Sequence, residues 1–139
     1  MRPDGPRERA EACIDWRRQR PVLAALRAGR RASWRRFDWT AFDGSLAPDA
    51  VVCEPAPVVV LEGVYSGRPE LADLLDHRVL VTAPDEVRTQ RLLAREGSIG
   101  PWERQWHEAE VYYFTHVAPA ASFDLVFDAG PPTDQDRPR

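Results

Sequence analysis

A glutamate in this sequence stands between a run of β-branched residues and a glycine, an arrangement that can bind a metal ion. The run is 57–62, it ends in Glu62, and Gly63 follows it. An uninterrupted apolar run of this length predicts a strand buried on both faces of a parallel sheet. Ligands bind beyond the carboxyl ends of such strands, where a carboxylate could bind Mg²⁺ beside transferring phosphates. Alternatively, Glu62 is a surface residue at the exit of a core strand.

Three arginines have the spacing of one helix face. Arg88, Arg91 and Arg95 lie three and four residues apart, so a helix over 84–96 would present them as one stripe. Guanidinium groups in a row could bind phosphate oxygens as charge shifts during transfer. The same spacing also fits a solvated face whose arginines pair with acidic neighbours, which are Asp85, Glu86 and Glu96.

Two aspartates stand next to aromatic residues. Asp15 precedes Trp16, and Asp38 lies between Phe37 and Trp39. An aspartate can accept hydrogen bonds from ribose hydroxyls, and an aromatic ring can stack on a base. The alternative is ordinary packing and helix capping. A further set, Glu103, His107 and Glu110, shares one face of an expected helix over 102–116 but lacks a second metal-binding motif, which favours a structural role.

Composition narrows the possible classes of function. The chain has 139 residues, 43% hydrophobic and 29% charged, which indicates one soluble globular domain. All 19 basic residues are arginine, yet the net charge is −3, so a nucleic-acid partner is not expected. The arginine-rich stretch 2–36 fits either a solvated face or a surface for phosphate or carboxylate groups.

The sequence also indicates the cellular compartment in which the protein is expected. No apolar run approaches the roughly 18 residues of a membrane helix, and no secretory signal is evident. Cys13 and Cys53 lack the spacing of a metal site or a redox pair. We therefore expect a cytoplasmic protein with reduced cysteines and no membrane partner.

Strands and helices are expected to alternate along the chain, which predicts an α/β fold with a parallel sheet flanked by helices. The pattern predicts a disordered arm over 1–12 and a flexible tail over 129–139, with one domain between them. Asp43-Gly44 marks a turn. The expected helices are 15–28, 69–75, 84–96 and 102–116, and the expected strands are 57–62, 78–82 and 123–127.

The order of these features resembles the uridine kinase family of P-loop phosphotransferases. The resemblance covers residues 13–128. Its moderately specific parts are the Glu-Gly strand at 60–65 and the arginine helix at 88–95. The weaker parts are Ile-Asp-Trp-Arg-Arg at 14–18, Arg-Phe-Asp-Trp at 36–39 and Phe-Asp-Leu-Val-Phe at 123–127.

The resemblance implies a partial P-loop kinase-like fold that transfers the γ-phosphate of ATP to a hydroxyl of a nucleoside or similar small molecule. It implies ATP and Mg²⁺ as cofactors and places Glu62 near the Mg²⁺. It also assigns Arg88, Arg91 and Arg95 to a lid that closes over the ATP phosphates.

The same resemblance implies an acceptor side. It places Asp15 against the sugar of the acceptor and Phe37 near its base, with Asp38 as a further substrate-binding residue. The histidine that usually follows the family's Tyr-Asp-Phe stretch is not evident after 37–39. The match to nucleoside-specific positions is therefore incomplete.

The sequence departs further from the family pattern at its front. It contains no Gly-x-x-x-x-Gly-Lys-Ser/Thr loop and no lysine at all, although such a loop cradles phosphates in P-loop kinases. We therefore expect that the first βα unit is missing and that the chain is truncated and weak or inactive alone. The alternative is a non-catalytic remnant that binds a phosphate ligand or a protein. A missing central strand would expose a sheet edge beside 58–61 and favour self-association.

Overall fold

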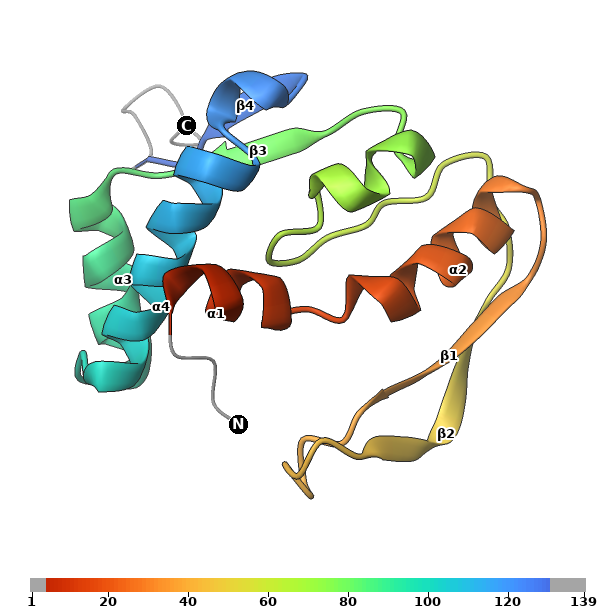
Figure 1. Ribbon diagram of the computed structural model, residues 1–139, viewed down its shortest axis with the longest axis horizontal. Coiled ribbons are helices and arrows are strands. Elements are labelled where there is room, and N and C mark those ends of the chain that lie inside the picture. Colours follow the sequence, from red (N-terminus) through yellow and green to blue (C-terminus); the bar gives the residue numbers. More distant parts are fainter. Residues whose placement is uncertain (1–4, 131–139) are drawn as a thin grey trace, which may run out of the picture. The chain divides into compact units, whose positions relative to one another are not determined.

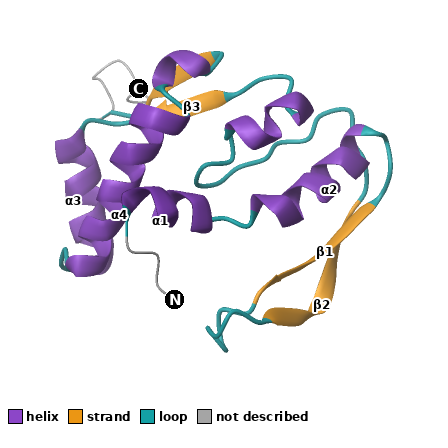
Figure 2. Ribbon diagram, viewed as in Figure 1, coloured by secondary structure: helices purple, strands orange, loops and turns teal. Residues whose placement is uncertain are grey.

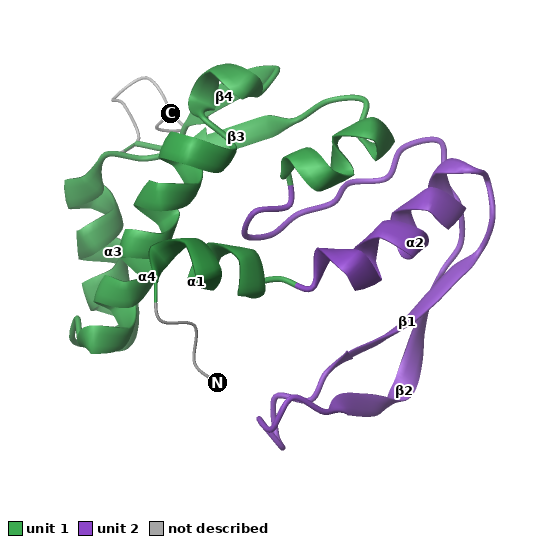
Figure 3. Ribbon diagram, in the orientation of Figure 1, with its two compact units in different colours: residues 1–14, 67–139 green, residues 15–66 purple. Residues whose placement is uncertain are grey.

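The computed structural model describes residues 5–130 and contains helices, one antiparallel strand pair and one parallel strand pair (Figures 1 and 2). The chain divides into two compact units, which are residues 1–14 with 67–139, and residues 15–66 (Figure 3). The structure is therefore mixed α/β, as the alternation of the sequence indicates. No helix within residues 5–130 has both the length and the apolar character needed to cross a membrane.

The first unit contains a parallel strand pair linked through two helices. Its strands are β3 (Val79–Thr82) and β4 (Leu125–Asp128), which run parallel with Val79 opposite Leu125. Its helices are α1 (Pro6–Ala12), α3 (Asp85–Glu96) and α4 (Pro101–Tyr112). Short helical turns cover Pro69–Leu74, Tyr113–Val117 and Ala120–Ser122.

The parallel pair is less buried than expected. The predicted strand 78–82 is confirmed, and so is the predicted strand 123–127, apart from small shifts of their ends. Strand β3 is largely exposed on one face, where Val79 is 51% and Val81 is 63% exposed. The reason is that within residues 5–130 this sheet has only two strands, whereas parallel strands are usually covered on both faces.

Helix α3 forms where the arginine spacing predicts a helix. Pro84 stands just before its first turn, Asp85 and Glu86 complement the positive end of the helix dipole, and Gly97 ends it with φ of 78°. None of its residues is fully buried, and Leu93 is 42% exposed. Helix α3 is thus a surface helix.

Helix α4 and its continuation form the best-buried part of the first unit. Glu103 accepts a hydrogen bond from the backbone N–H of Gly100 at 2.7 Å and so caps the helix. The predicted helix 102–116 is confirmed, with its last turn widened to π geometry at Tyr113–Val117. Ala109 and Tyr113 are buried at 2% and 1% exposure, and their spacing of four residues places them on one face of the helix.

The beginning of the chain differs from the expected disordered arm over 1–12. Residues Pro6–Ala12 form helix α1, which packs against α4. Pro6 at the first helical position is preorganised for a helix, and Ala10 is buried at 2% exposure. Arg9 also forms an ion pair with Glu108 at 3.0 Å. Of the expected tail, residues 131–139 lie outside the described residues.

The second unit contains a helix and an antiparallel ribbon. Helix α2 (Trp16–Arg27) confirms the predicted helix 15–28, and Pro21 lies inside it. Strands β1 (Ala32–Phe37) and β2 (Leu46–Cys53) pair with Ala32 opposite Cys53. Neither strand was expected from the sequence, because charged and aromatic residues obscure the alternation of β1 and Pro48 interrupts that of β2.

The turn between β1 and β2 is the predicted Asp43-Gly44 turn. Gly44 has φ of 93°, a backbone conformation that suits glycine. The carboxylate of Asp43 accepts a hydrogen bond from the backbone N–H of Ser45 at 2.9 Å. Hydrogen bonds from Ser45 hold the pKa of Asp43 below its ordinary value, so the carboxylate is charged in the turn.

The predicted strand over 57–62 is wrong. The segment has no regular secondary structure, and Val58 and Val60 are 78% and 82% exposed. A β-branched run becomes a strand only when a neighbouring strand takes up its backbone hydrogen bonds. Among residues 5–130 the paired strands are β1 with β2 and β3 with β4, so the run remains an exposed loop.

Candidate functional site

The carboxyl ends of β3 and β4 form one edge of the parallel pair. Thr82 and Asp128 are the last residues of these strands and lie opposite each other in the register. The backbone N–H of Ala129 donates to the carbonyl oxygen of Thr82 at 2.6 Å, and that of Gly130 donates to Asp128 Oδ1 at 3.0 Å. Helix α3 starts three residues after Thr82, so its first turn follows directly from this edge (Figure 1).

The three arginines of α3 are all exposed. Arg88 pairs with Asp85 at 3.3 Å and with Glu110, and Arg95 pairs with Glu96 at 2.6 Å. Two of the three arginines therefore pair with acidic side chains, as expected for a solvated helix face. Arg91 forms no hydrogen bond or ion pair with other residues in 5–130.

The contact between Arg88 and Glu110 joins two residues that are 22 positions apart in the sequence and lie on consecutive helices. Arg88 lies on α3, and Glu110 lies in the last turn of α4. Their side chains are 41% and 33% exposed, so the pair is at the surface but not fully solvated. The sequence favoured a structural role for Glu110 over metal binding but did not predict its pairing with Arg88, because no local pattern reveals a partner on another helix.

The two aspartates on the expected acceptor side both bind backbone groups. Asp15 precedes α2 and its side chain accepts from the N–H of Arg18 at 3.3 Å. Asp38 accepts from the N–H groups of Thr40 and Ala41 at 2.9 and 3.0 Å. Each carboxylate has further lone pairs, so a ligand hydroxyl could share it, but capping is its observed role.

Phe37 belongs to an aromatic cluster at the end of the β1–β2 ribbon. Its ring centroid lies 4.8 Å from that of Trp39 and 6.0 Å from that of Phe42. Trp39 and Phe42 are 77% and 69% exposed, and Phe42 has φ of 50°, which is unusual for a bulky residue. Sequence reasoning identified Phe37 but missed Phe42, although the spacing of three aromatics around one turn is visible in the sequence.

Glu62, the expected metal ligand, is an exposed residue of the 57–62 loop and belongs to the second unit. The adjoining Gly63 has φ of 144°, a backbone conformation that favours glycine. No group of three histidine, cysteine or acidic residues within 5–130 is arranged to hold a metal ion. Magnesium often uses one or two carboxylates together with phosphate oxygens, and an exposed Glu62 suits that mode of binding.

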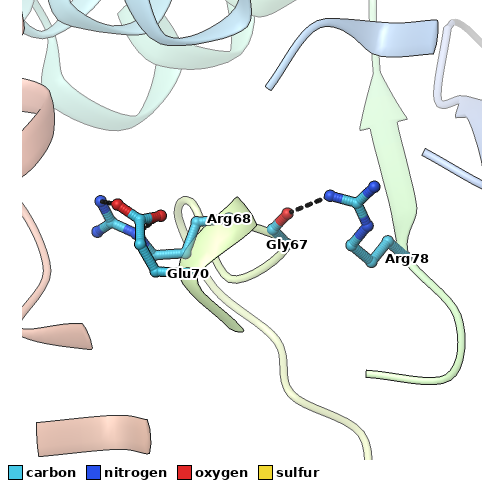
Figure 4. Close-up of polar contacts among 4 residues, drawn as sticks. All are labelled: Gly67, Arg68, Glu70 and Arg78. Atoms are coloured by element: carbon cyan, nitrogen blue, oxygen red, sulfur yellow. Dashed lines mark hydrogen bonds and ion pairs between the residues drawn. The ribbon is translucent and has the colours of Figure 1, made fainter. Parts of the chain in front are cut away.

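A buried arginine in the first unit was missed by sequence reasoning. Arg68 is only 2% exposed, and its Nε and Nη2 donate to the two carboxylate oxygens of Glu70 at 3.0 and 3.1 Å (Figure 4). Such a two-point pair is among the stronger charge-assisted contacts. Burial raises the pKa of two further groups, Tyr113 to about 12 and Cys13 to about 11. The positive charge of Arg68 partly opposes both shifts.

Arg78 ties together three segments of the first unit. Its guanidinium donates to the carbonyl oxygens of Gly67, at 3.3 Å (Figure 4), and of Ser122. It also lies 5.4 Å from the ring centroid of Phe123, and its backbone N–H donates to Asp124 at 2.7 Å. These contacts brace the entry of both parallel strands, so Arg78 is structural.

Comparison of the sequence with models of protein families and with curated proteins found no match.

Proposed function

We propose that the chain is part of a phosphotransferase that resembles uridine kinases and moves the γ-phosphate of ATP to a nucleoside or similar small-molecule hydroxyl. The observation that supports this proposal is the position of α3. The helix follows the carboxyl edge of a parallel strand pair and presents three exposed arginines. That edge is where ligands bind in open α/β sheets, and arginine is well suited to phosphate.

In this proposal the arginines act by electrostatics and positioning. Arg91 and Arg95 would bind phosphate oxygens first, and Arg88 would join them as negative charge grows. The resemblance to uridine kinases would give Glu62 the role of binding Mg²⁺, the ion that neutralises phosphate charge in such enzymes.

The acceptor would be bound by residues of the second unit. Asp15 and Asp38 would accept hydrogen bonds from its sugar hydroxyls, and Phe37 would contact its base. Both carboxylates already hold backbone N–H groups, which fixes their orientation. A fixed carboxylate loses little freedom when a ligand binds it.

The alternative is a chain that binds a phosphate-bearing ligand without transferring it. This alternative is favoured by the absence of lysine from the 139 residues, because the phosphate-cradling loop of a P-loop kinase requires one. A catalytic site would need that loop from outside this sequence.

Calorimetric titration of the purified chain with ATP and with pyrophosphate tests both forms of the proposal. We expect binding that weakens about tenfold in a variant with Arg91→Ala and Arg95→Ala, the loss typical of two exposed charged contacts. Arg104→Ala on α4 is the matched control, because Arg104 is also an exposed helical arginine, and its side chain donates to the carbonyl oxygen of Ile99 rather than to a carboxylate. No binding by the unaltered chain, or equal loss in the control, would refute a role for the arginine stripe.

Phosphate transfer itself is tested by reading the genomic DNA upstream of the codon for Met1. An in-frame Gly-x-x-x-x-Gly-Lys-Ser/Thr sequence there supports a transferase, and the longer product should phosphorylate a nucleoside in the presence of ATP and Mg²⁺. A reading frame closed directly upstream refutes transfer and leaves phosphate binding as the function.

A further inference from the structure

Arg88 differs from the other two arginines of α3 in what surrounds its guanidinium group. Its Nη1 donates to Asp85 and its Nη2 donates to Glu110. Each terminal nitrogen of Arg88 therefore already donates to a carboxylate, which competes with any anion for it. A phosphate that binds arginine in the usual two-point manner needs such nitrogens.

The other two arginines keep their terminal nitrogens available. Arg95 uses only Nε, which pairs with Glu96 at 2.6 Å. Arg91 has no polar contact with other residues in the described part of the chain. An anion that approaches α3 therefore meets Arg91 and Arg95 before Arg88.

The net charge around Arg88 also makes it less available to an anion than Arg91 and Arg95. Arg88, Asp85 and Glu110 form a cluster of one positive and two negative groups, with a net charge of −1. Glu110 is the less exposed of the two acids, at 33% against 79% for Asp85. The less solvated charge is the less screened one, so Glu110 is the stronger competitor for Arg88.

We propose that the carboxylate of Glu110 pairs with Arg88 in the free protein and that a phosphate ligand displaces it. This inference rests on the proposed function, because it takes α3 to be the phosphate-binding helix. Since the Arg88–Glu110 contact joins α3 to α4, ligand binding exchanges an interhelical ion pair for an arginine–phosphate pair. Glu110 is a positioning residue, which sets the affinity of the site without touching the ligand.

The experiment measures pyrophosphate affinity by calorimetry for the unaltered chain, Glu110→Gln and Glu108→Gln. Glu110→Gln should bind pyrophosphate about fivefold more tightly, the size expected for removing one partly exposed competing charge. Glu108→Gln is the matched control, because Glu108 lies on the same helix and pairs with Arg9 instead. It removes the same formal charge and should change the affinity by less than about twofold at moderate salt.

A double-mutant cycle separates competition from a general effect on the fold. In a chain that carries Arg88→Ala, the substitution Glu110→Gln should no longer tighten binding, because the carboxylate has no arginine to withhold. Glu110→Asp offers a second variant that keeps the charge but shortens the side chain by one methylene, and it should also bind more tightly. Circular dichroism shows whether each variant retains its helices.

The outcomes distinguish this inference from the proposed function. If the unaltered chain binds no pyrophosphate and Glu110→Gln binds none either, the phosphate function fails and the inference fails with it. If the unaltered chain binds and Glu110→Gln binds no more tightly than Glu108→Gln, only the inference is overturned. Tighter binding by Glu110→Gln that persists in the Arg88→Ala chain would also overturn it.

Discussion

Removing the carboxylate of Glu70 should destabilise the first unit more than any surface substitution. Arg68 is 2% exposed, and Glu70 accepts two hydrogen bonds from its guanidinium. The substitution Glu70→Ala leaves a buried positive charge without these two acceptors. Removing one partner of a buried ion pair typically costs about 3–5 kcal/mol.

The magnitude is set by how far water can replace the carboxylate. The side chain of Glu70 is 35% exposed, so solvent can partly take its place, and we expect a loss of about 2–3 kcal/mol, at or below the lower end of that range. With a urea m-value of about 2 kcal/mol per M, the unfolding midpoint should fall by about 1–1.5 M.

The assay is urea unfolding followed by far-ultraviolet circular dichroism. Glu11→Ala is the control, because Glu11 also forms a short ion pair in the first unit, with Arg7 at 3.0 Å, but both side chains are well exposed. Its midpoint should be indistinguishable from that of the unaltered chain. Adding Arg68→Met to Glu70→Ala should recover much of the loss, because it removes the buried charge that has lost these two acceptors. Equal midpoints for Glu70→Ala and Glu11→Ala would refute the reasoning.

Four further predictions concern packing, capping, ionisation and association. Gly67→Ala should lower stability by about 1–3 kcal/mol, because the added Cβ would lie 2.7 Å from the ring of Phe123; an unchanged melting temperature would contradict this. Asp15→Ala should cost about 1 kcal/mol and Asp15→Asn much less, because Asp15 caps α2; equal melting curves for the two variants would argue against capping. Burial raises the pKa of Cys13 from 9.0 to about 11. In a Cys53→Ser chain at pH 8, the Cys13 thiol should therefore react with a disulfide reagent about 100-fold more slowly in the folded protein than in the unfolded protein. Because the raised pKa favours the neutral thiol in the folded state, this contribution to stability is present below pH 9 and is lost as the pH rises towards 11; equal reaction rates would contradict the shift. The purified chain should self-associate through the exposed apolar side chains of β3 and β4, and sedimentation as a monomer at all concentrations would count against it.

Helices were largely predictable from the sequence because their signals are local. Asp15 before α2, Pro84 before α3 and Gly97 after it mark helix ends through contacts within a few residues. The arginine stripe of α3 follows from spacing alone. Helix α1 was missed because its stability depends on packing against α4, which no local pattern records.

Strands were predictable only where the chain supplies a partner. The sequence indicates β3 and β4, and the two strands pair although partner residues are 46 positions apart in the sequence. The run 57–62 has stronger strand propensity than either and forms no strand, since β structure is completed by hydrogen bonds to another segment. The ribbon β1–β2 shows the converse, because pairing formed strands from an unpromising sequence.

For the candidate site, the spacing of Arg88, Arg91 and Arg95 was enough to predict that they share one face of a helix. The tertiary structure sets the charge partner of each arginine, because these partners depend on packing between elements. It joined Arg88 to Glu110 on another helix, left Arg91 without a polar contact among residues 5–130, and buried Arg68 against Glu70. Spacing along one helix fixes a stripe of charge, whereas the availability of that charge depends on acids that the fold brings from elsewhere.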